Sequence, residues 1–241
     1  MKKPRMILFD YGQTIIAQDG FNGLKGTEEV LKYAVGNKYG LTAEQVQAQA
    51  DSINRELGRA DPSSRHLTEV EVPNYMFTAY LYDSLGIKIG LRPDEIDRVF
   101  WDAASPGRPT EGIVSFLDHL FAGGIRTGVV SNISFAGNVV AERINRLLPG
   151  NHFEFIIASS EYLFRKPNAR IFSLALEFAG LEPSDAWYVG DDYDCDVVGA
   201  RNAGILPVWY KGCIDRPQRD RDDVMKIYSW NELEAVIDGC L

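Results

Sequence analysis

The sequence predicts an α/β fold in which helices cover a doubly wound parallel sheet and a helical segment is inserted after the first strand. Three observations carry this prediction: short apolar runs, helical spacing between them, and a long interval without such runs. Short continuous apolar runs are typical of strands buried on both faces of a parallel sheet. They occur at residues 6–9, 125–130, 153–158, 186–189 and 205–210.

Helices are expected between these runs, because apolar residues recur there at helical spacing. The clearest helix has Thr110 as its N-cap, places Ile113, Phe116 and Leu120 on one stripe, and stops at Gly123. Alternating strands and helices imply right-handed crossovers, and the active sites of such sheets lie at the carboxyl ends of the strands. Further helices are expected at residues 135–148, 168–179 and 230–237.

The interval from residue 19 to residue 107 breaks this alternation. It contains helix-like segments and no comparable buried-strand run, so we interpret it as a helical insertion after the first strand. The expected domains are a core of residues 1–18 and 108–241 and a helical domain of residues 19–107. The charged segment 211–226, which carries Pro217, is expected to be a surface loop. The expected helices of the insertion span residues 27–37, 42–57, 69–85 and 93–104.

Composition and charge restrict the class of partner. The 241 residues are 45% hydrophobic and carry a net charge of -9, which argues against a broad surface for nucleic acid or anionic membranes. We therefore expect neither partner. The apolar run before Asp10 is too short for a signal peptide or a membrane span. Cys195, Cys213 and Cys240 form no CxxC pair, which fits a reducing compartment and a cytoplasmic protein.

Polar residues follow several of the predicted strands. Asp10, Ser131 and Asp191 come directly after apolar runs, and Lys166 lies in a loop before a helix. Each alone has a structural explanation, such as a turn former, a polar loop or a helix N-cap. Together at one sheet edge, however, these groups can position a metal ion and a phosphoryl group. Asp191, Asp192 and Asp196 support this interpretation, because closely spaced carboxylates repel one another without a cation.

At this point the sequence resembles the haloacid dehalogenase-like superfamily over the whole chain except the insertion. The segments ILFDYGQT, VVSN, RKP and VGDDYDCDVVGARNAG resemble its four motifs in order, and the last match is the strongest. The resemblance implies a Rossmann-like sheet with a helical cap inserted after the first strand. It also implies a Mg²⁺-dependent phosphohydrolase that acts on a small phosphorylated metabolite.

The resemblance assigns a role to each of these residues. It implies that Asp10 attacks phosphorus to form an aspartyl-phosphate. Ser131, together with the backbone N–H of Asn132, would bind phosphoryl oxygens, and Lys166 would neutralise the charge of nucleophile and phosphate. Mg²⁺ is the implied cofactor. Its expected ligands are the Asp10 and Asp191 carboxylates and the Gly12 carbonyl, with Asp196 completing the site.

Gly12 departs from the family pattern. Phosphatases of this family usually carry a second aspartate two positions after the nucleophile, which acts as general acid and base. Proton transfer of this kind contributes about 10²- to 10⁴-fold in rate. Glycine leaves three alternatives open.

The first alternative is a phosphatase whose leaving group needs no proton, such as an acyl or aryl phosphate, or one that recruits a group such as Glu69 or His66. The second is a hydrolase of C–P bonds that resembles phosphonoacetaldehyde hydrolase, with Lys32 or Lys38 as the candidate Schiff-base lysine. The third is a binding protein for phosphorylated ligands without catalytic activity. A dehalogenase is less consistent with the sequence, because the acidic fourth motif is retained.

Overall fold

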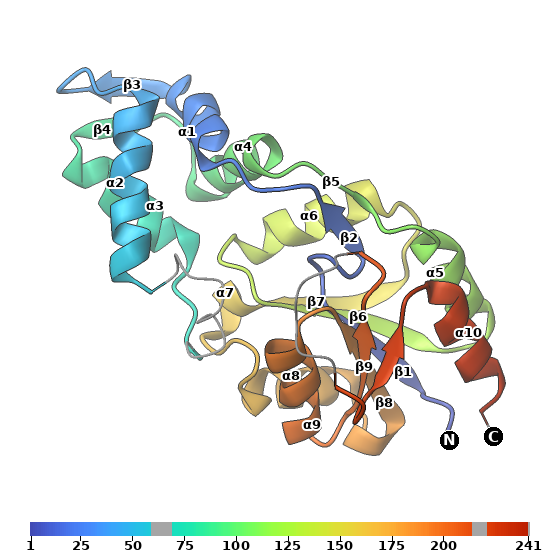
Figure 1. The fold of residues 1–241 in the computed structure, drawn as a ribbon. Helices are drawn as coiled ribbons and strands as arrows, with labels where there is room; N and C mark the ends of the chain where they lie inside the picture. The colour runs from blue at the N-terminus through green and yellow to red at the C-terminus, as the bar shows by residue number, and fades with distance from the viewer. Residues whose placement is uncertain (59–68, 214–220, 241) are drawn as a thin grey trace.

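The sheet positions the candidate site. The computed structural model describes residues 1–58, 69–213 and 221–240, and Figure 1 shows two lobes of unequal size. The larger lobe is built on a six-stranded parallel sheet with the order β10-β9-β8-β1-β6-β7. Its strands are β1 (Met6–Phe9), β6 (Arg126–Ser131), β7 (Phe153–Ala158), β8 (Ala186–Gly190), β9 (Leu206–Tyr210) and β10 (Met225–Ile227).

The first strand is central because it is apolar on both faces. Ile7 and Phe9 pack in one hydrophobic cluster and Met6 and Leu8 in another. Helices α5 (Ile113–Ala122), α6 (Gly137–Leu147) and α10 (Trp230–Asp238) cover the first face, while α8 (Ala169–Ala179) and α9 (Gly199–Asn202) cover the second. The predicted doubly wound parallel sheet is therefore confirmed.

Two predictions for the larger lobe are wrong in detail. Residues 225–227 form the edge strand β10, where Met225 pairs with Val208; so short a strand gives no apolar run in the sequence. Thr110 does not cap α5, because Gly112, with φ of 81°, precedes the helix. The Thr110 hydroxyl donates instead to the Thr14 carbonyl over 2.8 Å.

The smaller lobe has a hydrophobic cluster of its own, which includes Val30, Val46 and Leu81. The sequence predicts a helical insertion, but this lobe also contains two strands. The predicted helix 27–37 ends early, and its last residues form strand β3 (Ala34–Asn37), which pairs with β4 (Ile87–Ile89). This ribbon is largely exposed, so no buried run marks it in the sequence. The helices of this lobe are α1 (Gly23–Leu31), α2 (Ala43–Glu56), α3 (Asn74–Ser84) and α4 (Pro93–Ala104).

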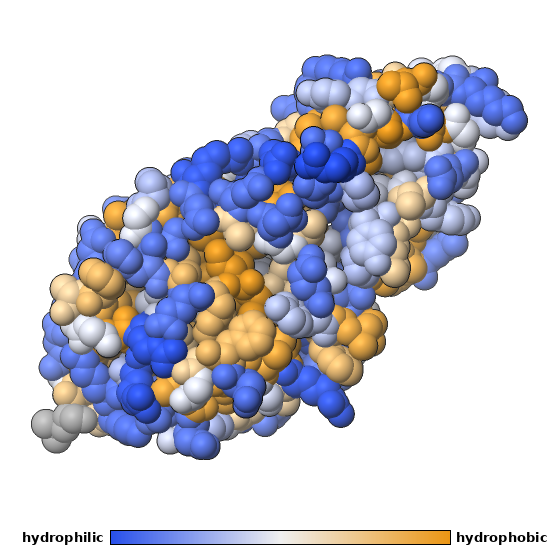
Figure 2. All heavy atoms as spheres, turned by 180° about the vertical axis from the view of Figure 1, so that it is seen from behind, coloured by the Kyte–Doolittle hydropathy of each residue, from blue (hydrophilic) through white to orange (hydrophobic). Residues whose placement is uncertain are grey.

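The two lobes join at the antiparallel ribbon of β2 (Ile16–Gln18) and β5 (Gly107–Pro109). The predicted boundaries at residues 18 and 107 fall on this ribbon, although the division into two domains stays a prediction. Figure 2 shows the opposite side of the molecule, where hydrophilic side chains are spread over both lobes. Each helix in the described ranges is too short or too polar to cross a membrane.

Helix α4 is fastened to α6 by the buried side chain of Arg143. Its guanidinium donates to the Tyr11 hydroxyl over 2.9 Å and also to the Asp102 carboxylate and the Ser105 carbonyl oxygen. Its plane lies over the Trp101 ring, 4.4 Å from the centroid. Each of its three nitrogens donates a hydrogen bond, as expected of a buried arginine with a structural role.

We expect Arg143→Met to lower the free energy of unfolding by about 2–4 kcal/mol, because it leaves buried acceptors without donors. Arg146→Met is the matched control, since Arg146 also pairs with Asp102 but is exposed; its loss should cost less than about 1 kcal/mol. Urea unfolding of both variants measures the difference. Equal losses would contradict a fastening role for Arg143.

Candidate active site

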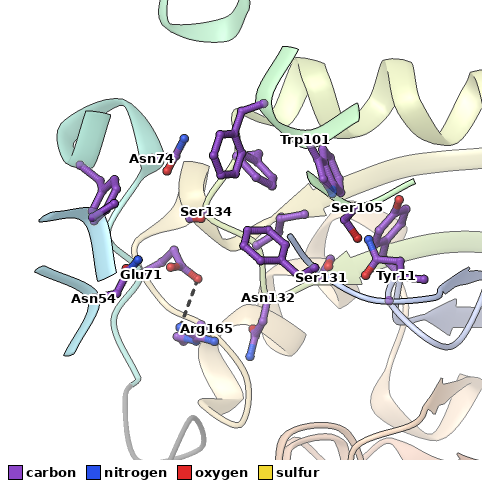
Figure 3. A pocket seen from close by; sticks show the side chains of 18 of the residues that line it. Tyr11, Asn54, Glu71, Asn74, Trp101, Ser105, Ser131, Asn132, Ser134 and Arg165 are labelled. Carbon is purple, nitrogen blue, oxygen red and sulfur yellow. Dashed lines mark ion pairs between the residues drawn. The ribbon is translucent and has the colours of Figure 1, made fainter. Parts of the chain in front are cut away.

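The predicted site residues meet at the carboxyl edge of the sheet. Asp10 follows β1, Ser131 ends β6 and Asp191 follows β8, while Lys166 lies in the loop before α8. A pocket of about 840 Å³ opens there toward the smaller lobe, and Figure 3 shows some of its side chains. All the residues predicted to act in catalysis, substrate binding or metal binding line it: Asp10, Gly12, Ser131, Asn132, Lys166, Asp191 and Asp196.

The centre of the site is the buried ammonium group of Lys166. It donates to Asp10 Oδ1 over 2.6 Å, to Asp196 Oδ1 over 2.6 Å and to the Tyr188 hydroxyl over 2.7 Å. An ammonium group has three N–H donors, so all are used. Burial alone would lower the pKa of Lys166, but Asp10 and Asp196 raise it well above its ordinary value. The group is therefore a permanent cation at neutral pH.

Tyr188 is a site residue that the sequence reasoning missed. Its hydroxyl accepts from Lys166 and donates toward the Val130 carbonyl oxygen over 3.0 Å. Burial raises its pKa well above the ordinary value, so the hydroxyl stays neutral. Its only sequence signal is a phenol inside the apolar run before Gly190.

Asp196 reaches the centre because the chain turns tightly after β8. Asp192 caps the helical turn η3 (Tyr193–Val198) by accepting from Cys195 N over 2.9 Å, and Asp196 Oδ2 accepts from Asp192 N over 2.9 Å. A Cβ at Gly190 would lie 2.3 Å from Asp196 Cγ, so only glycine admits this carboxylate. Burial raises the pKa of Asp196 to about 7, although Lys166 opposes this shift.

The side chain of Asn132 holds the lysine loop. Its Oδ1 accepts from Lys166 N over 2.7 Å, and its Nδ2 donates to the Lys166 carbonyl oxygen over 2.8 Å. The amide therefore fixes the backbone on both sides of the Lys166 side chain. Its backbone N–H remains the group that we expect to bind a phosphoryl oxygen.

The acidic cluster fits a hard divalent cation. Carboxylate oxygens of Asp10, Asp191 and Asp196 lie within 4.8 Å of one another, and Gly12 lines the same pocket. The indole of Trp209 donates to the Asp191 carbonyl oxygen over 2.9 Å and so fixes the backbone there. Oxygen donors in such a set suit Mg²⁺. Lys166 binds Oδ1 of both Asp10 and Asp196, while Oδ2 of Asp196 accepts from Asp192 N.

Gly12 is not required by the backbone. It is absent from the described glycines with positive φ, and a Cβ at this position would have Gln18 Oε1 as its nearest neighbour, at 3.6 Å. A Cβ at this position would therefore make only an ordinary van der Waals contact. The neighbouring Gln13 has a structural role, because its amide donates to the Gln18 carbonyl oxygen over 2.7 Å and accepts from Cys213 Sγ.

Glu69, one suggested replacement for the missing aspartate, and the candidate Schiff-base lysines lie outside the pocket. Glu69 accepts from Asn168 over 2.7 Å and does not line the pocket. Lys32 pairs with Glu29, and Lys38 lies over the Tyr39 ring. Neither lysine lines the pocket. His66 lies outside the described residues. The structure thus gives no support to a Schiff-base lysine at Lys32 or Lys38.

The pocket wall toward the smaller lobe contains two charged residues that the sequence reasoning also missed. Glu71 is buried and accepts from the Ser159 hydroxyl over 2.8 Å. Arg165 lies 3.5 Å from it, as the dashed line in Figure 3 marks. Arg165 belongs to the RKP segment, but nothing in the sequence indicates that its side chain enters the pocket.

We expect Tyr188→Phe to lower the free energy of unfolding by about 1–3 kcal/mol, because a buried ammonium N–H loses its acceptor. Tyr228→Phe, at an exposed position, is the control and should change the value by less than about 0.5 kcal/mol. Chemical denaturation compares the two variants. Equal, small effects would show that the Tyr188 hydroxyl does not support Lys166.

The chain is similar in sequence to known hydrolases. Residues 4–204 match the family of haloacid dehalogenase-like hydrolases. The pyrimidine 5'-nucleotidase YjjG of Escherichia coli is 29% identical over 233 residues, 96% of each chain. The glyceraldehyde 3-phosphate phosphatase of Methanothermobacter thermautotrophicus is 34% identical over 115 residues, which cover 47% of this chain and 49% of that one.

Two solved structures show the same fold. A HAD phosphatase from Thermococcus onnurineus has a TM-score of 0.66 at 22% identity and covers 100% of this chain and 99% of its own. A 2-haloacid dehalogenase from Pseudomonas syringae has a TM-score of 0.65 at 21% identity and covers 99% of both chains. Because one is a phosphatase and the other a dehalogenase, these likenesses bear on the fold alone.

Proposed function

Because the chain belongs to the haloacid dehalogenase-like hydrolase family, we propose that it is a Mg²⁺-dependent phosphohydrolase acting on a small phosphorylated metabolite. The observation that carries this proposal is the buried contact of Lys166 with Asp10 and Asp196 beside Asp191. It pairs a carboxylate nucleophile with fixed positive charge and with a site for a cation. The names of the E. coli and Methanothermobacter relatives support phosphate esters as the substrate class.

In the first step an oxygen of Asp10 attacks phosphorus. A bond forms between this oxygen and phosphorus, the bond from phosphorus to the leaving oxygen breaks, and its electron pair stays on the leaving group. Lys166 orients the Asp10 carboxylate through the 2.6 Å contact. The Ser131 hydroxyl and the Asn132 N–H would donate to the phosphoryl oxygens.

Mg²⁺, when bound by Asp10, Asp191, Asp196 and the Gly12 carbonyl, would supply positive charge against the repulsion between the nucleophile and the phosphate. In the second step a water oxygen bonds to phosphorus and the bond from phosphorus to the Asp10 oxygen breaks, with its electron pair left on the Asp10 carboxylate. The protons of the water leave with the inorganic phosphate. The pocket wall formed by the smaller lobe, our proposed cap of residues 19–107, would limit access of bulk water. The three free cysteines fit the proposed cytoplasmic location.

Gly12 shapes the substrate preference in this proposal. No carboxylate two residues after Asp10 can protonate the leaving oxygen or activate the water. Leaving groups that depart as stable anions therefore suit the site best, as in acyl and aryl phosphates. Alkyl monoesters should react slowly.

Asp10→Asn should abolish Mg²⁺-dependent release of phosphate from para-nitrophenyl phosphate, because an amide is a poor nucleophile toward phosphorus. Asp118→Asn, an exposed change on α5, is the matched control and should keep full activity. Full activity in Asp10→Asn would show that the nucleophile is wrongly assigned. If orthovanadate binds but no ester in a broad panel is hydrolysed, the protein is a binder of phosphorylated ligands instead.

Gly12→Asp should raise kcat/KM for alkyl phosphates by about 10- to 100-fold, because it restores a proton donor. Gly12→Ala adds a Cβ without a carboxylate and should leave that value unchanged, since the space at residue 12 admits the extra atom. Steady-state rates on one aryl and one alkyl phosphate give the comparison. Equal kcat/KM values for the two substrates in the unmodified protein would refute the preference.

A further inference from the structure

We propose that Arg165 binds an anionic group, a carboxylate or a second phosphate, on the leaving-group part of the substrate. The inference rests on the proposed function and names the substrate class of the same pocket. Arg165 lines the pocket immediately before Lys166 in the chain. Its backbone is held on both sides, because its N–H donates to the Glu69 carbonyl and its carbonyl accepts from Asn168 N, each over 3.0 Å.

The hydrogen-bonding capacity of this guanidinium is largely unused. Its Nε is buried and has no hydrogen-bond partner among the described residues. Its ion pair with Glu71 spans 3.5 Å, longer than the 2.7–2.9 Å expected of a charge-assisted hydrogen bond. A buried donor without an acceptor is unfavourable, because it has lost its hydrogen bonds to water. A ligand that brought acceptor oxygens to this side chain would remove that cost.

Arg143 shows how this chain treats an arginine with a structural role. It is buried beside residues that line the pocket, and it donates to Tyr11, Asp102 and Ser105 and lies over an indole ring. Arg165 has no comparable set of acceptors in the described part of the chain. Its planar fork of donors matches the oxygens of a carboxylate or phosphate. The difference indicates a ligand-binding role for Arg165.

The position of Arg165 assigns it to the leaving group. In an in-line displacement the leaving oxygen points away from Asp10, and thus toward the remainder of the pocket. In Figure 3, Arg165 and Glu71 lie on the side of Asn54 and Asn74, whereas Ser131 and Tyr11 lie on the other side. Lys166 cannot serve this remote group, because its three donors are already bound. Two arginines in the described ranges line the pocket, and Arg165 is largely enclosed whereas Arg55 is exposed.

Glu71 provides a second test, because its negative charge should oppose the binding of an anionic substrate. Its carboxylate faces Arg165 and would repel an incoming anion, while the Ser159 hydroxyl and the backbone pairing of Glu71 with Leu163 hold it in place. Glu71→Gln keeps an acceptor for Ser159 but removes the negative charge. It should therefore tighten binding of an anionic substrate while Arg165→Gln weakens it. Opposite signs at neighbouring residues separate direct recognition from general damage to the pocket.

The test uses aryl phosphates that differ only at the para position: a carboxylate, a second phosphate, or an uncharged carboxamide of similar shape. Arg165→Gln should lower kcat/KM for the two anionic substrates by about 10- to 100-fold and for the carboxamide by less than about 3-fold. Arg165→Lys should recover part of the loss. Arg170→Gln, an exposed arginine of the same segment that lies outside the pocket, should change nothing.

The two anionic substrates distinguish a carboxylate from a second phosphate as the group that Arg165 binds. The substrate whose kcat/KM falls more in Arg165→Gln carries that group. Equal losses on charged and uncharged substrates, or no loss on either anion, would overturn the role of Arg165 while leaving the phosphohydrolase proposal intact. Binding of the corresponding benzylphosphonates, measured by calorimetry, needs no turnover. If charge selectivity appears there without any hydrolysis, Arg165 is assigned correctly and the proposed reaction is wrong.

Discussion

The ammonium group of Lys166, shared between Asp10 and Asp196, is the interaction on which the rest of the site depends. Two carboxylates buried side by side would repel each other and lose their hydration, a cost of several kcal/mol for each ion without a partner. The surrounding chain keeps this cation in place: Asn132 clamps the backbone of Lys166, and Tyr188 takes its third donor. The same contact holds the Asp10 carboxylate in place at the carboxyl edge of the sheet, where the proposed nucleophile must lie.

Much of the fold could be predicted because its central strands are buried on both faces. The run at residues 6–9 is apolar throughout, as expected of a central strand that is buried on both faces. Asp10 follows this strand and therefore lies at the carboxyl edge of the sheet. The same reasoning placed Ser131 and Asp191 at one edge, since parallel strands end together. Both features could be predicted because the burial of a strand is visible in its own residues.

The features that the sequence did not predict depend on contacts with residues far away in the chain, or on strands that are not buried. The exposed ribbon of β3 and β4 leaves no buried run, and Thr110 resembles an N-cap until its hydroxyl is seen to bind the Thr14 carbonyl. Tyr188 reads as one more apolar strand residue because only the fold brings Lys166 to its hydroxyl. The role proposed for Arg165 likewise depends on the fold, which buries its Nε without a hydrogen-bond acceptor among the described residues.

The central claim is that Asp10 is a metal-assisted nucleophile whose second step is slow because Gly12 supplies no base. Acid quenching during turnover of an aryl phosphate with Mg²⁺, followed by mass spectrometry of the peptides, tests it most directly. We predict a phosphoryl group on the peptide that carries Asp10, present in the unmodified protein and depleted in Gly12→Asp, where water attack is faster. Phosphate release without any adduct at Asp10, or with an adduct on another residue, would contradict the account.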